Sequence, residues 1–437
     1  MRATSPWILA VLPTKIAAMD LHANLRPIAK RIGVTLEVGI QGKQLRQPKV
    51  STIQIVSADQ LLDALASLQR IDEIRGLDLV LCEDLDQLDF DYELAVSLLR
   101  YFTQRQPTRF VGVSASLDNS SDLASWLNVD AMGVCDFRPQ DRDQSLRVQH
   151  QTFAIPYSTS LFKAMTKPAC QAIEEAPPNS PVLVFVPSKE QCKGIALDLI
   201  TYRTVQKEAA RGYIPPDVSD DLLHDYCARL QDRSLIDFVV KGIGFFHSRI
   251  NRADRLLILE MYAEGIISVL LAPRETCWSI PVRAVVVIVM GTQRLYVEKE
   301  WADRQLKDYT IRELSRMQSR AVQQTGTGYF HLFCPGESLD TYTRFLENGL
   351  PLESDLLEPD NLGRWQSIFK HRSTRKQLGD FLSFTYLSRR ITSNPTYYGF
   401  KSRDRTVNTS SVVDQITETC QKASNPQASG GGTISKA

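Results

Sequence analysis

The sequence lacks several patterns that would assign a function at once. Its 437 residues include eight cysteines, but no two of them form a CxxC pair. Neither a zinc site nor a disulfide framework is therefore predicted, and the cysteines are interpreted as buried, reduced thiols. No apolar run approaches the roughly 18 residues of a membrane span, so no membrane attachment is expected. No secretory signal is predicted either, because the apolar run Trp7–Leu12 is short and leads directly into the fold.

The sequence also lacks an excess of either charge. It has 51 Lys and Arg residues against 50 Asp and Glu residues, a formal net charge of +1. A nucleic-acid site must therefore come from a local arrangement of basic side chains and not from bulk charge. The hydrophobic share of 43% and the charged share of 23% are ordinary for a globular protein.

Three catalytic signatures are missing as well. No GxxxxGK[ST] loop occurs, and residues 39–43 have the wrong spacing and no Ser or Thr after the Lys. Such a loop holds nucleotide phosphates with its backbone N–H groups and its Lys. The GxSxG elbow of hydrolases and the HExxH motif of zinc peptidases are also absent, and no metal ligand is predicted.

What the sequence does contain is an alternation of short apolar runs and amphipathic stretches. Runs rich in Val, Ile and Leu that end at Pro, Gly or polar residues are typical of strands buried in a parallel sheet. Predicted strands are Trp7–Leu12, Thr35–Ile40, Ile53–Val56, Leu77–Cys82, Arg109–Val113, Pro181–Ser188, Ser268–Pro273, Ala284–Met290 and Tyr329–Cys334. Predicted helices are 16–32, 58–68, 92–103, 161–176, 190–202 and 251–264.

This alternation predicts an α/β fold with right-handed crossovers, divided into two domains at 1–150 and 151–351. Residues 136–180 are interpreted as a bridging segment with one helix. Because the first strand begins so near residue 1, the first sheet is expected to lack an opening strand. Residues 352–423 are expected to form a connector, within which residues 361–400 carry basic and aromatic residues at helical spacing. The Gly/Ser-rich tail 424–437 is expected to be disordered.

Candidate functional residues follow the ends of predicted strands, where open α/β sheets bind ligands. Glu83, Asp84 and Asp86 follow one strand, and carboxylates at this position hold Mg²⁺ and orient water in nucleotide enzymes. A solvated acidic turn is the structural alternative. Ser114 and Ser116 follow another strand and suggest a hydrogen-bonding hinge, with a plain small-residue turn as the alternative.

Basic residues of the second domain offer weaker candidates. Arg312, Arg316 and Arg320 are four residues apart and are expected on one face of a helix, where they could meet phosphate. A solvated charged face is the alternative. His247 is interpreted as a histidine on a packed loop.

Four segments, taken in order, resemble superfamily 2 DExH-box RNA helicases of the Ski/Sec63 class. They are Pro181–Cys192, Gly242–Gln293, Leu346–Leu356 and Phe381–Gly399. The resemblance covers residues 8–420 and is closest to the degenerate C-terminal cassette of two-cassette spliceosomal members. It implies two RecA-like parallel-sheet domains, the first truncated at its N-terminus, followed by a partial winged-helix domain.

The resemblance also implies motif positions. Glu83, Asp84 and Asp86 stand at the DExH box, in place of its Asp, Glu and His. Arg320 keeps the first arginine of motif VI, whereas Gln323 replaces the second, which is an arginine finger. Contacts to the nucleic-acid backbone are implied at two short segments, whose members are Pro13, Thr14, Lys15, Ser114 and Ser116.

These departures favour a pseudoenzyme over an ATPase. ATP hydrolysis needs a phosphate cradle, a carboxylate for magnesium, a Glu that orients water and an arginine against the developing charge. Loss of a finger arginine alone costs about 10³-fold or more in rate. We therefore expect a helicase-like interaction and regulatory scaffold in pre-mRNA splicing. It would be nuclear and would bind spliceosomal proteins, with RNA as a further partner. No cofactor is expected.

Two alternatives stay open. The chain could be a fragment of an ATP-dependent RNA helicase, of the spliceosome or of the signal-cointegrator and ribosome-quality-control type, which would bind Mg-ATP and act in the nucleus or the cytoplasm. It could also be a free-standing nucleotide- or RNA-binding protein. Arg389-Arg390 with Tyr397-Tyr398 is the candidate cluster for that activity, and packing within a winged helix is the structural alternative for these four residues.

Overall fold

The chain folds into two compact units in the computed structural model, which describes residues 5–40, 45–66, 74–142, 144–206, 210–296, 304–322, 326–365 and 375–424. The first unit combines Met1–Phe137 with Gly349–Ala437, and the second unit is the continuous stretch Arg138–Asn348. The predicted domain limits and the winged-helix identity of the connector remain predictions. Apart from Ser424, the predicted disordered tail lies outside the described residues.

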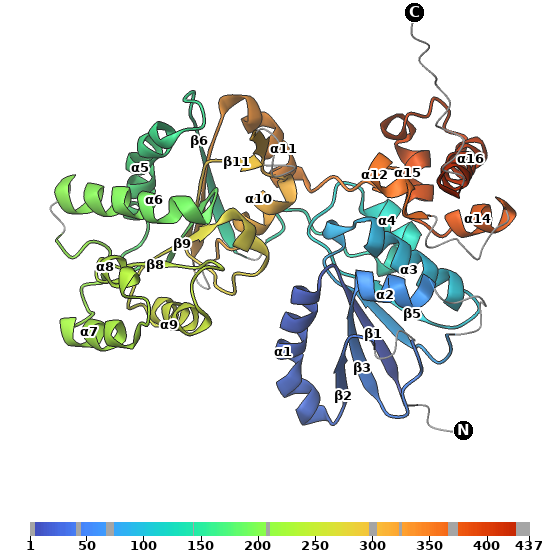
Figure 1. Cartoon of the computed structure of the whole chain (residues 1–437), viewed down its shortest axis with the longest axis horizontal. Coiled ribbons are helices and arrows are strands. Elements are labelled where there is room, and N and C mark those ends of the chain that lie inside the picture. Colours follow the sequence, from blue (N-terminus) through green and yellow to red (C-terminus); the bar gives the residue numbers. More distant parts are fainter. Residues whose placement is uncertain are drawn as a thin grey trace, which may run out of the picture. The chain divides into compact units, whose positions relative to one another are not determined.

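The first unit contains a five-stranded sheet with the order β2-β3-β1-β4-β5 (Figure 1). All neighbouring strands are parallel. The strands are β1 (Trp7–Leu12), β2 (Thr35–Val38), β3 (Thr52–Ser57), β4 (Leu79–Cys82) and β5 (Arg109–Gly112). β1 lies in the centre and is almost wholly buried, as its unbroken apolar run predicts.

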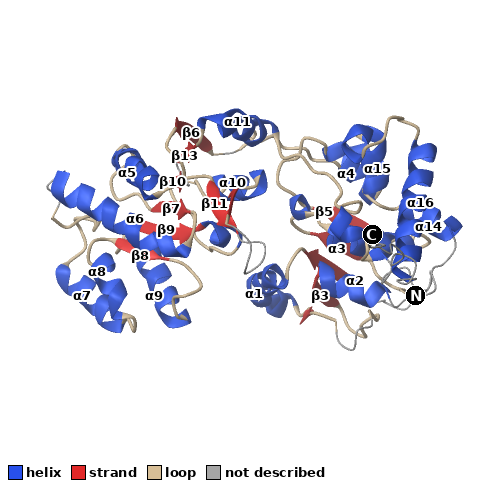
Figure 2. Ribbon diagram, turned by 45° about the horizontal axis from the view of Figure 1, so that its top comes forward, coloured by secondary structure: helices blue, strands red, loops and turns tan. Residues whose placement is uncertain are grey.

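Helices cover both faces of this sheet. They are α1 (Lys15–Ile32), α2 (Ala58–Ala66), α3 (Phe90–Thr103) and α4 (Ser120–Leu127). Right-handed crossovers place α1 on one face and α2 and α3 on the other, as Figure 2 shows. Helix α1 ends at Gly33, whose φ of 70° is a left-handed conformation that glycine adopts without strain. The predicted helix end at this glycine is confirmed.

The second unit contains a six-stranded parallel sheet with the order β6-β13-β10-β7-β9-β8. The strands are β6 (Ser145–Thr152), β7 (Val182–Val186), β8 (Ile243–Phe245), β9 (Val269–Pro273), β10 (Val286–Met290) and β13 (Thr327–Cys334). Every residue of β7, β9 and β10 is buried, which explains why these strands read as continuous apolar runs. β11 (Gln293–Tyr296) and β12 (Gln305–Asp308) form a separate antiparallel pair.

Helices surround the second sheet. The longer ones are α5 (Thr159–Glu174), α6 (Lys189–Thr201), α7 (Asp220–Arg229), α9 (Arg252–Ala263), α10 (Ile311–Gln318) and α11 (Leu339–Asn348). Helix α10 begins with a capping box, in which the Thr310 side chain accepts from the Glu313 backbone and the Glu313 side chain accepts from the Thr310 backbone. This local pattern holds Glu313 at a fixed position next to the sheet.

Strand β6 corrects the interpretation of residues 136–180 as a bridging segment. It pairs in parallel with β13 over its full length and is the edge strand of the second sheet. Its sequence, SLRVQHQT, is polar and mostly exposed. A search for apolar runs could not find it, because an edge strand with little buried surface needs few apolar residues.

The elements that the structure describes in the C-terminal part of the first unit are helices joined by loops. Its helices are α12 (Pro359–Leu362), α14 (Arg375–Leu382), α15 (Leu387–Ser393) and α16 (Arg405–Ser424). α14 packs against α3, and α15 packs against α4. Nε1 of Trp126 donates to the Phe384 carbonyl (3.0 Å), and Nδ2 of Asn119 donates to the Leu352 carbonyl (2.8 Å). These contacts explain why residues after 348 belong to the first unit.

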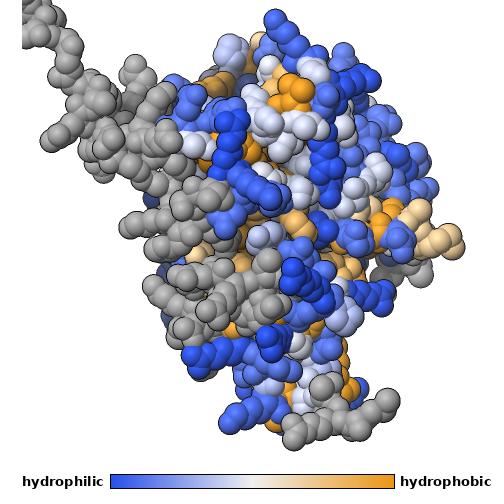
Figure 3. Space-filling view, turned by 90° about the vertical axis from the view of Figure 1, so that its right-hand side faces the viewer, coloured by the Kyte–Doolittle hydropathy of each residue, from blue (hydrophilic) through white to orange (hydrophobic). Residues whose placement is uncertain are grey.

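The face of the molecule in Figure 3 carries mostly hydrophilic side chains, with hydrophobic ones in small patches between them. Among the described residues, no helix combines the length and the apolar character of a membrane span. Two α/β domains with parallel sheets, as in RecA-like proteins, confirm the predicted fold class.

Glu93 of α3 is a buried carboxyl group that binds the C-terminal part of the first unit. It is fully buried, and its Oε1 accepts a hydrogen bond from the Leu387 backbone (2.7 Å). Burial raises the pKa of Glu93 from its ordinary value of 4.5 to about 8. The folded chain therefore keeps a proton on Glu93 that the unfolded chain releases above about pH 4.5.

This linkage predicts that the first unit loses stability as the pH rises. Between about pH 4.5 and 8 the unfolded state binds fewer protons, so the free energy of unfolding falls by up to about 1.4 kcal/mol per pH unit. Glu93→Gln keeps an acceptor for the Leu387 N–H but has no proton to lose, so we expect its stability to vary less with pH. Chemical denaturation of both proteins between pH 5 and 8.5 measures the difference. Parallel curves for the two proteins would contradict the assignment.

Candidate functional site

The carboxyl ends of the strands in the first sheet bring two of the predicted segments together. Because these strands are parallel, their ends lie at one edge of the sheet, where α/β proteins bind ligands. The buried Tyr92 hydroxyl stands at this edge, 2.9 Å from the Val11 carbonyl oxygen and 2.7 Å from the Glu83 carbonyl oxygen. It thereby joins the end of β1 to the end of β4. The backbone that carries the acidic residues is therefore held in place by the sheet.

The acidic turn after β4 is integrated into the fold. Asp84 has a φ of 54°, a left-handed conformation that is uncommon for residues other than glycine. Asp86 is 1% exposed, and its Oδ1 accepts a hydrogen bond from the Ala115 backbone (3.0 Å). This bond links the turn after β4 to the segment after β5. The alternative of a solvated acidic turn is therefore wrong for Asp86.

The segment after β5 also contacts the C-terminal part of the first unit. The carbonyl of Ser116 accepts from the Leu350 backbone (2.8 Å), and the Asp118 backbone donates to the Leu350 carbonyl (3.0 Å). The side-chain oxygens of Ser114 and Ser116 are buried and have no hydrogen-bond partner among the described residues. They remain available to a ligand.

The segment after β1 has local partners. The Thr14 hydroxyl accepts from the Ala17 backbone (3.2 Å) and caps α1, which follows Pro13 and Thr14. Lys15 lies 3.4 Å from Asp59, and both side chains are more than half exposed. An exposed pair of this kind contributes little to stability, so Lys15 can exchange Asp59 for another anion.

Basic side chains surround His247 at the carboxyl edge of the second sheet. His247 follows β8 and is 9% exposed, in agreement with the packed-loop interpretation. Burial, and then the charges of Lys189, Arg249 and Lys193, lower its pKa. These effects outweigh the opposing charge of Glu190, so the neutral imidazole is favoured near pH 7.

The predicted arginine triplet is only partly correct. Arg312 and Arg316 lie on α10, but the helix ends at Gln318, so Arg320 is beyond it. The Arg316 guanidinium lies 5.5 Å from the centre of the Trp278 ring, and Nη2 of Arg320 is 3.4 Å from the Cys277 carbonyl oxygen. Both side chains therefore pack against the turn after β9. Gln323 lies outside the described residues.

A buried ion pair in the same region was not predicted. Arg274, in the turn after β9, pairs with Glu313, and their side chains are 16% and 8% exposed. Burial, and then the charge of Arg294, lower the pKa of Arg274. The Thr-x-x-Glu capping signature is visible in the sequence, but its contact with a residue far upstream is not. The pair fixes α10 to the end of β9.

The Arg389–Tyr398 cluster is largely internal. Arg390 is 8% exposed and pairs with both Asp122 and Glu353. The Tyr398 hydroxyl donates to Glu353 (2.8 Å) and accepts from the Ser354 backbone (2.8 Å). These two residues therefore pack within the fold and are not available to RNA, while the winged-helix part of that interpretation stays a prediction.

Comparisons with known proteins identify relatives but no family model matches the chain. The chain is 32% identical over 332 residues to the human "U5 small nuclear ribonucleoprotein 200 kDa helicase", a match that covers 74% of the chain and 15% of the helicase. The chain is therefore similar to one part of DExH-box helicases. It is also 33% identical to chicken "Activating signal cointegrator 1 complex subunit 3", over 70% of the chain and 14% of that protein. A third relative is the yeast "RQC trigger complex helicase SLH1", with 29% identity over 88% of the chain and 20% of that protein.

The match to DExH-box helicases covers only a small part of each of these proteins, at most 20% of their length. The homology agrees with the predicted helicase resemblance and with two RecA-like sheets. Among the described residues, no group of three or more His, Cys, Asp or Glu side chains could hold a metal ion. Glu83 and Asp84 follow β4 at the carboxyl edge of the first sheet, and the Asp86 carboxylate accepts the Ala115 N–H within the fold.

Proposed function

We propose that the chain is a helicase-like module that binds other proteins and does not hydrolyse ATP. Within the family it would correspond to the degenerate C-terminal cassette of a spliceosomal helicase. The observation that carries this proposal is the state of Asp86, which occupies the position of the DExH-box His. Its buried carboxylate accepts the Ala115 N–H and so serves to join two segments of the fold. A side chain used in this way is not available for chemistry on a nucleotide.

The exchange of the two preceding acids supports the same proposal. Asp84 stands where the family has the Glu that orients the attacking water, and its side chain is shorter by one methylene group. Asp84 also has left-handed backbone geometry. Phosphoryl transfer depends on positioning, so a displacement of about 1 Å can lower the rate about 100-fold. The missing GxxxxGK[ST] loop and the Gln323 exchange in the sequence point in the same direction.

The relatives suggest the kind of partner. Their names place them in a small nuclear ribonucleoprotein, a cointegrator complex and a trigger complex, so each is a component of a larger assembly. By homology, this chain would act in pre-mRNA splicing or a related RNA process, in the nucleus, with proteins of such an assembly as partners and RNA as a further ligand. No cofactor would be required. If its partners are instead those of a trigger complex, the chain would act in the cytoplasm.

Calorimetric titration with Mg-ATP tests the proposal. We expect no binding heat and no RNA-stimulated phosphate release, because the chain has neither the phosphate loop nor the Glu. The double variant Glu83→Asp/Asp84→Glu restores the family order of the two acids and is the matched control. It should be equally inactive, since the order of the acids does not create a phosphate cradle.

A second candidate function would follow from the opposite result. One relative is named "DExH-box ATP-dependent RNA helicase DExH14", and it is 30% identical over 76% of the chain. Magnesium-dependent ATP binding with turnover would favour this alternative, in which the chain is a working part of a helicase. The proposal of a non-hydrolysing module would then be abandoned.

A further inference from the structure

The first sheet ends in a strand whose outer edge is open among the described residues. β5 is the last strand in the sheet order. Alternate residues of this segment form the backbone hydrogen bonds to β4 and the residue before it. The Arg109 N–H donates to the Asp78 carbonyl (2.9 Å), and the Val113 N–H donates to the Cys82 carbonyl (2.8 Å). Because the pattern repeats every second residue, the backbone groups of Phe110 and Gly112 face away from β4. They are directed to the open edge.

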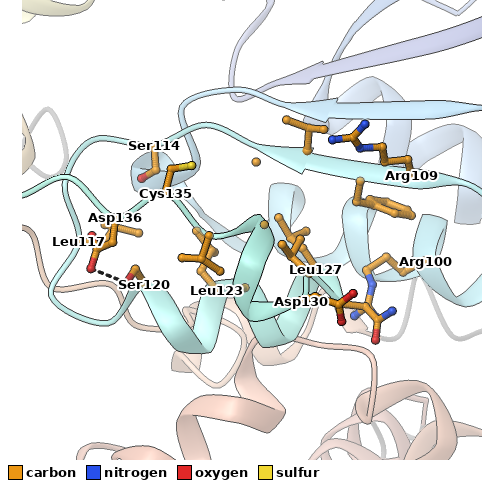
Figure 4. A pocket seen from close by; sticks show the side chains of 18 of the residues that line it. Arg100, Arg109, Ser114, Leu117, Ser120, Leu123, Leu127, Asp130, Cys135 and Asp136 are labelled. Atoms are coloured by element: carbon orange, nitrogen blue, oxygen red, sulfur yellow. Dashed lines mark hydrogen bonds between the residues drawn. The ribbon is translucent and has the colours of Figure 1, made fainter.

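A groove of about 870 Å³ runs along this edge. β5, α4 and residues 128–137 line it, and Figure 4 shows it between the strand and the helix. Leu123 and Leu127 of α4 face it as apolar side chains. Met132 and Phe137 also line it, and they are 97% and 68% exposed, which is unusual for such large apolar residues. The groove therefore combines an unpaired strand with apolar walls.

Three buried polar atoms in the groove have no hydrogen-bond partner within the described chain. They are Nη1 of Arg100 and the side-chain oxygens of Ser114 and Ser116, and all three residues line the groove. Buried polar atoms in folded proteins are nearly always hydrogen-bonded, because an unsatisfied one costs about 1–3 kcal/mol. Three of them in one groove indicate that a ligand supplies the missing partners.

The charge at one end of the groove defines that ligand further. Burial, and then the charge of Arg389, lower the pKa of Arg100 to about 10. Asp130 lies at the same end in Figure 4, but no carboxylate of the described residues forms an ion pair with Arg100. A partly buried guanidinium group beside a second arginine favours an added carboxylate. The ligand should carry a negative charge at this end.

We propose that the groove binds one extended segment of a partner protein, which adds to β5 as a further strand. The segment would be apolar on the side that faces the groove and would place a carboxylate against Arg100. Backbone hydrogen bonds to Phe110 and Gly112 would supply affinity, and the pockets between α4 and β5 would supply specificity. This proposal deepens the scaffold function by naming the class of partner, but it does not require that ATP hydrolysis be absent. A chain that turned over ATP could still bind such a segment, so the two proposals can fail separately.

Fluorescence anisotropy with short labelled peptides tests the proposal. The probe is acetyl-Glu-Val-Thr-Val-Thr-Val, and its matched control has Lys in place of Glu. We expect the Glu probe to bind at least about tenfold more tightly, because a hydrogen bond to a charged group contributes about 1.5–3 kcal/mol. A third peptide with Pro in place of both Thr residues lacks two backbone donors and should not bind. Arg100→Gln should abolish the preference for Glu, whereas Arg26→Gln, which removes an exposed arginine of α1, should preserve it.

Two measurements on the unaltered protein keep the test independent of how well the variants fold. The Glu probe should slow hydrogen–deuterium exchange in the peptide that covers residues 109–117. It should also protect Cys135, an exposed cysteine that lines the groove, from a maleimide, with Cys135→Ser as the blank. Both effects together would support strand addition at β5.

Three results would overturn the proposal. The first is equal affinity for the Glu and Lys probes, without protection of residues 109–117. The second is protection of the same residues by a ten-nucleotide oligouridylate but not by the peptide, which would make the groove a nucleic-acid site. The third is a dimer in sedimentation experiments that already protects residues 109–117 without peptide, which would make a second copy of the chain the occupant.

Discussion

Replacing Arg390 with Leu is expected to lower the free energy of unfolding of the first unit by about 3–5 kcal/mol. Arg390 is buried and pairs with two carboxylates, those of Asp122 and Glu353. Removing a single partner from a buried ionic network leaves charges that neither water nor a counter-ion stabilises. The loss should therefore be several times larger than that of a surface ion pair.

The position of these two ion pairs determines which part of the molecule the substitution destabilises. Asp122 belongs to α4, whereas Glu353 and Arg390 belong to the C-terminal part of the first unit. Burial alone would raise the pKa of Glu353, but hydrogen bonds from Arg390, Asn394 and Tyr398 lower it. In the variant Glu353 loses the strongest of these partners. We expect the segment after residue 348 to separate from α3 and α4 more readily.

Thermal denaturation and limited proteolysis measure this effect. The transition of the first unit should fall by on the order of 10 °C, since about 1 kcal/mol shifts the midpoint by about 2–4 °C in a domain of this size. Early cleavage should appear between residues 349 and 424. Arg389→Leu is the matched control, because the adjacent Arg389 donates only to the Ser383 carbonyl and forms no ion pair among the described residues. Equal destabilisation by both variants would show that the network is not the cause.

Replacing Arg274 with Met should have an effect of similar size on the second unit. The variant leaves Glu313, with an 8% exposed side chain, as a buried carboxylate without its cation. We expect a loss of about 3–5 kcal/mol for this single change. Adding Glu313→Gln should recover part of the stability, because no buried charge remains. The amide oxygen can still accept the Thr310 N–H that Glu313 now accepts at 2.9 Å.

The comparison of single and double variants is the informative measurement. Urea denaturation, followed by the circular dichroism of each protein, gives the free energies, and Arg283→Met serves as a control at an exposed arginine. A double variant that is less stable than Arg274→Met would mean that Glu313 stabilises α10 by some route other than the pair. The capping box would then be the first structure to examine.

The central strands could be predicted from the sequence because burial on both faces leaves a local mark. The runs at β1, β7, β9 and β10 lie within two residues of their predicted positions for this reason. The polar edge strand β6 leaves no such mark and was missed. The start and end of α1 were predictable from local signals, since capping residues act within one turn.

The candidate site was predictable only in part. Strand ends show where Asp86 and Ser116 lie, but the bond from Ala115 to Asp86 joins two segments that follow different strands. The attachment of the C-terminal helices depends on contacts such as that between Glu93 and Leu387, which are 294 positions apart. The groove beside β5 consists of an unpaired edge and a bend of the chain after α4. A single sequence carries no periodic pattern for features of this kind.

The first unit consists of two separate stretches of the chain, and this affects the order in which the units fold during synthesis on the ribosome. The second unit is one uninterrupted stretch, Arg138–Asn348, so it can complete its core as soon as it has emerged. The first sheet emerges earlier, yet Glu93 and Trp126 gain their partners at Leu387 and Phe384 only after the second unit has been made. We therefore expect the middle of the chain to mature before its beginning. Until the C-terminal helices are made, the first unit should expose apolar surface that chaperones can bind.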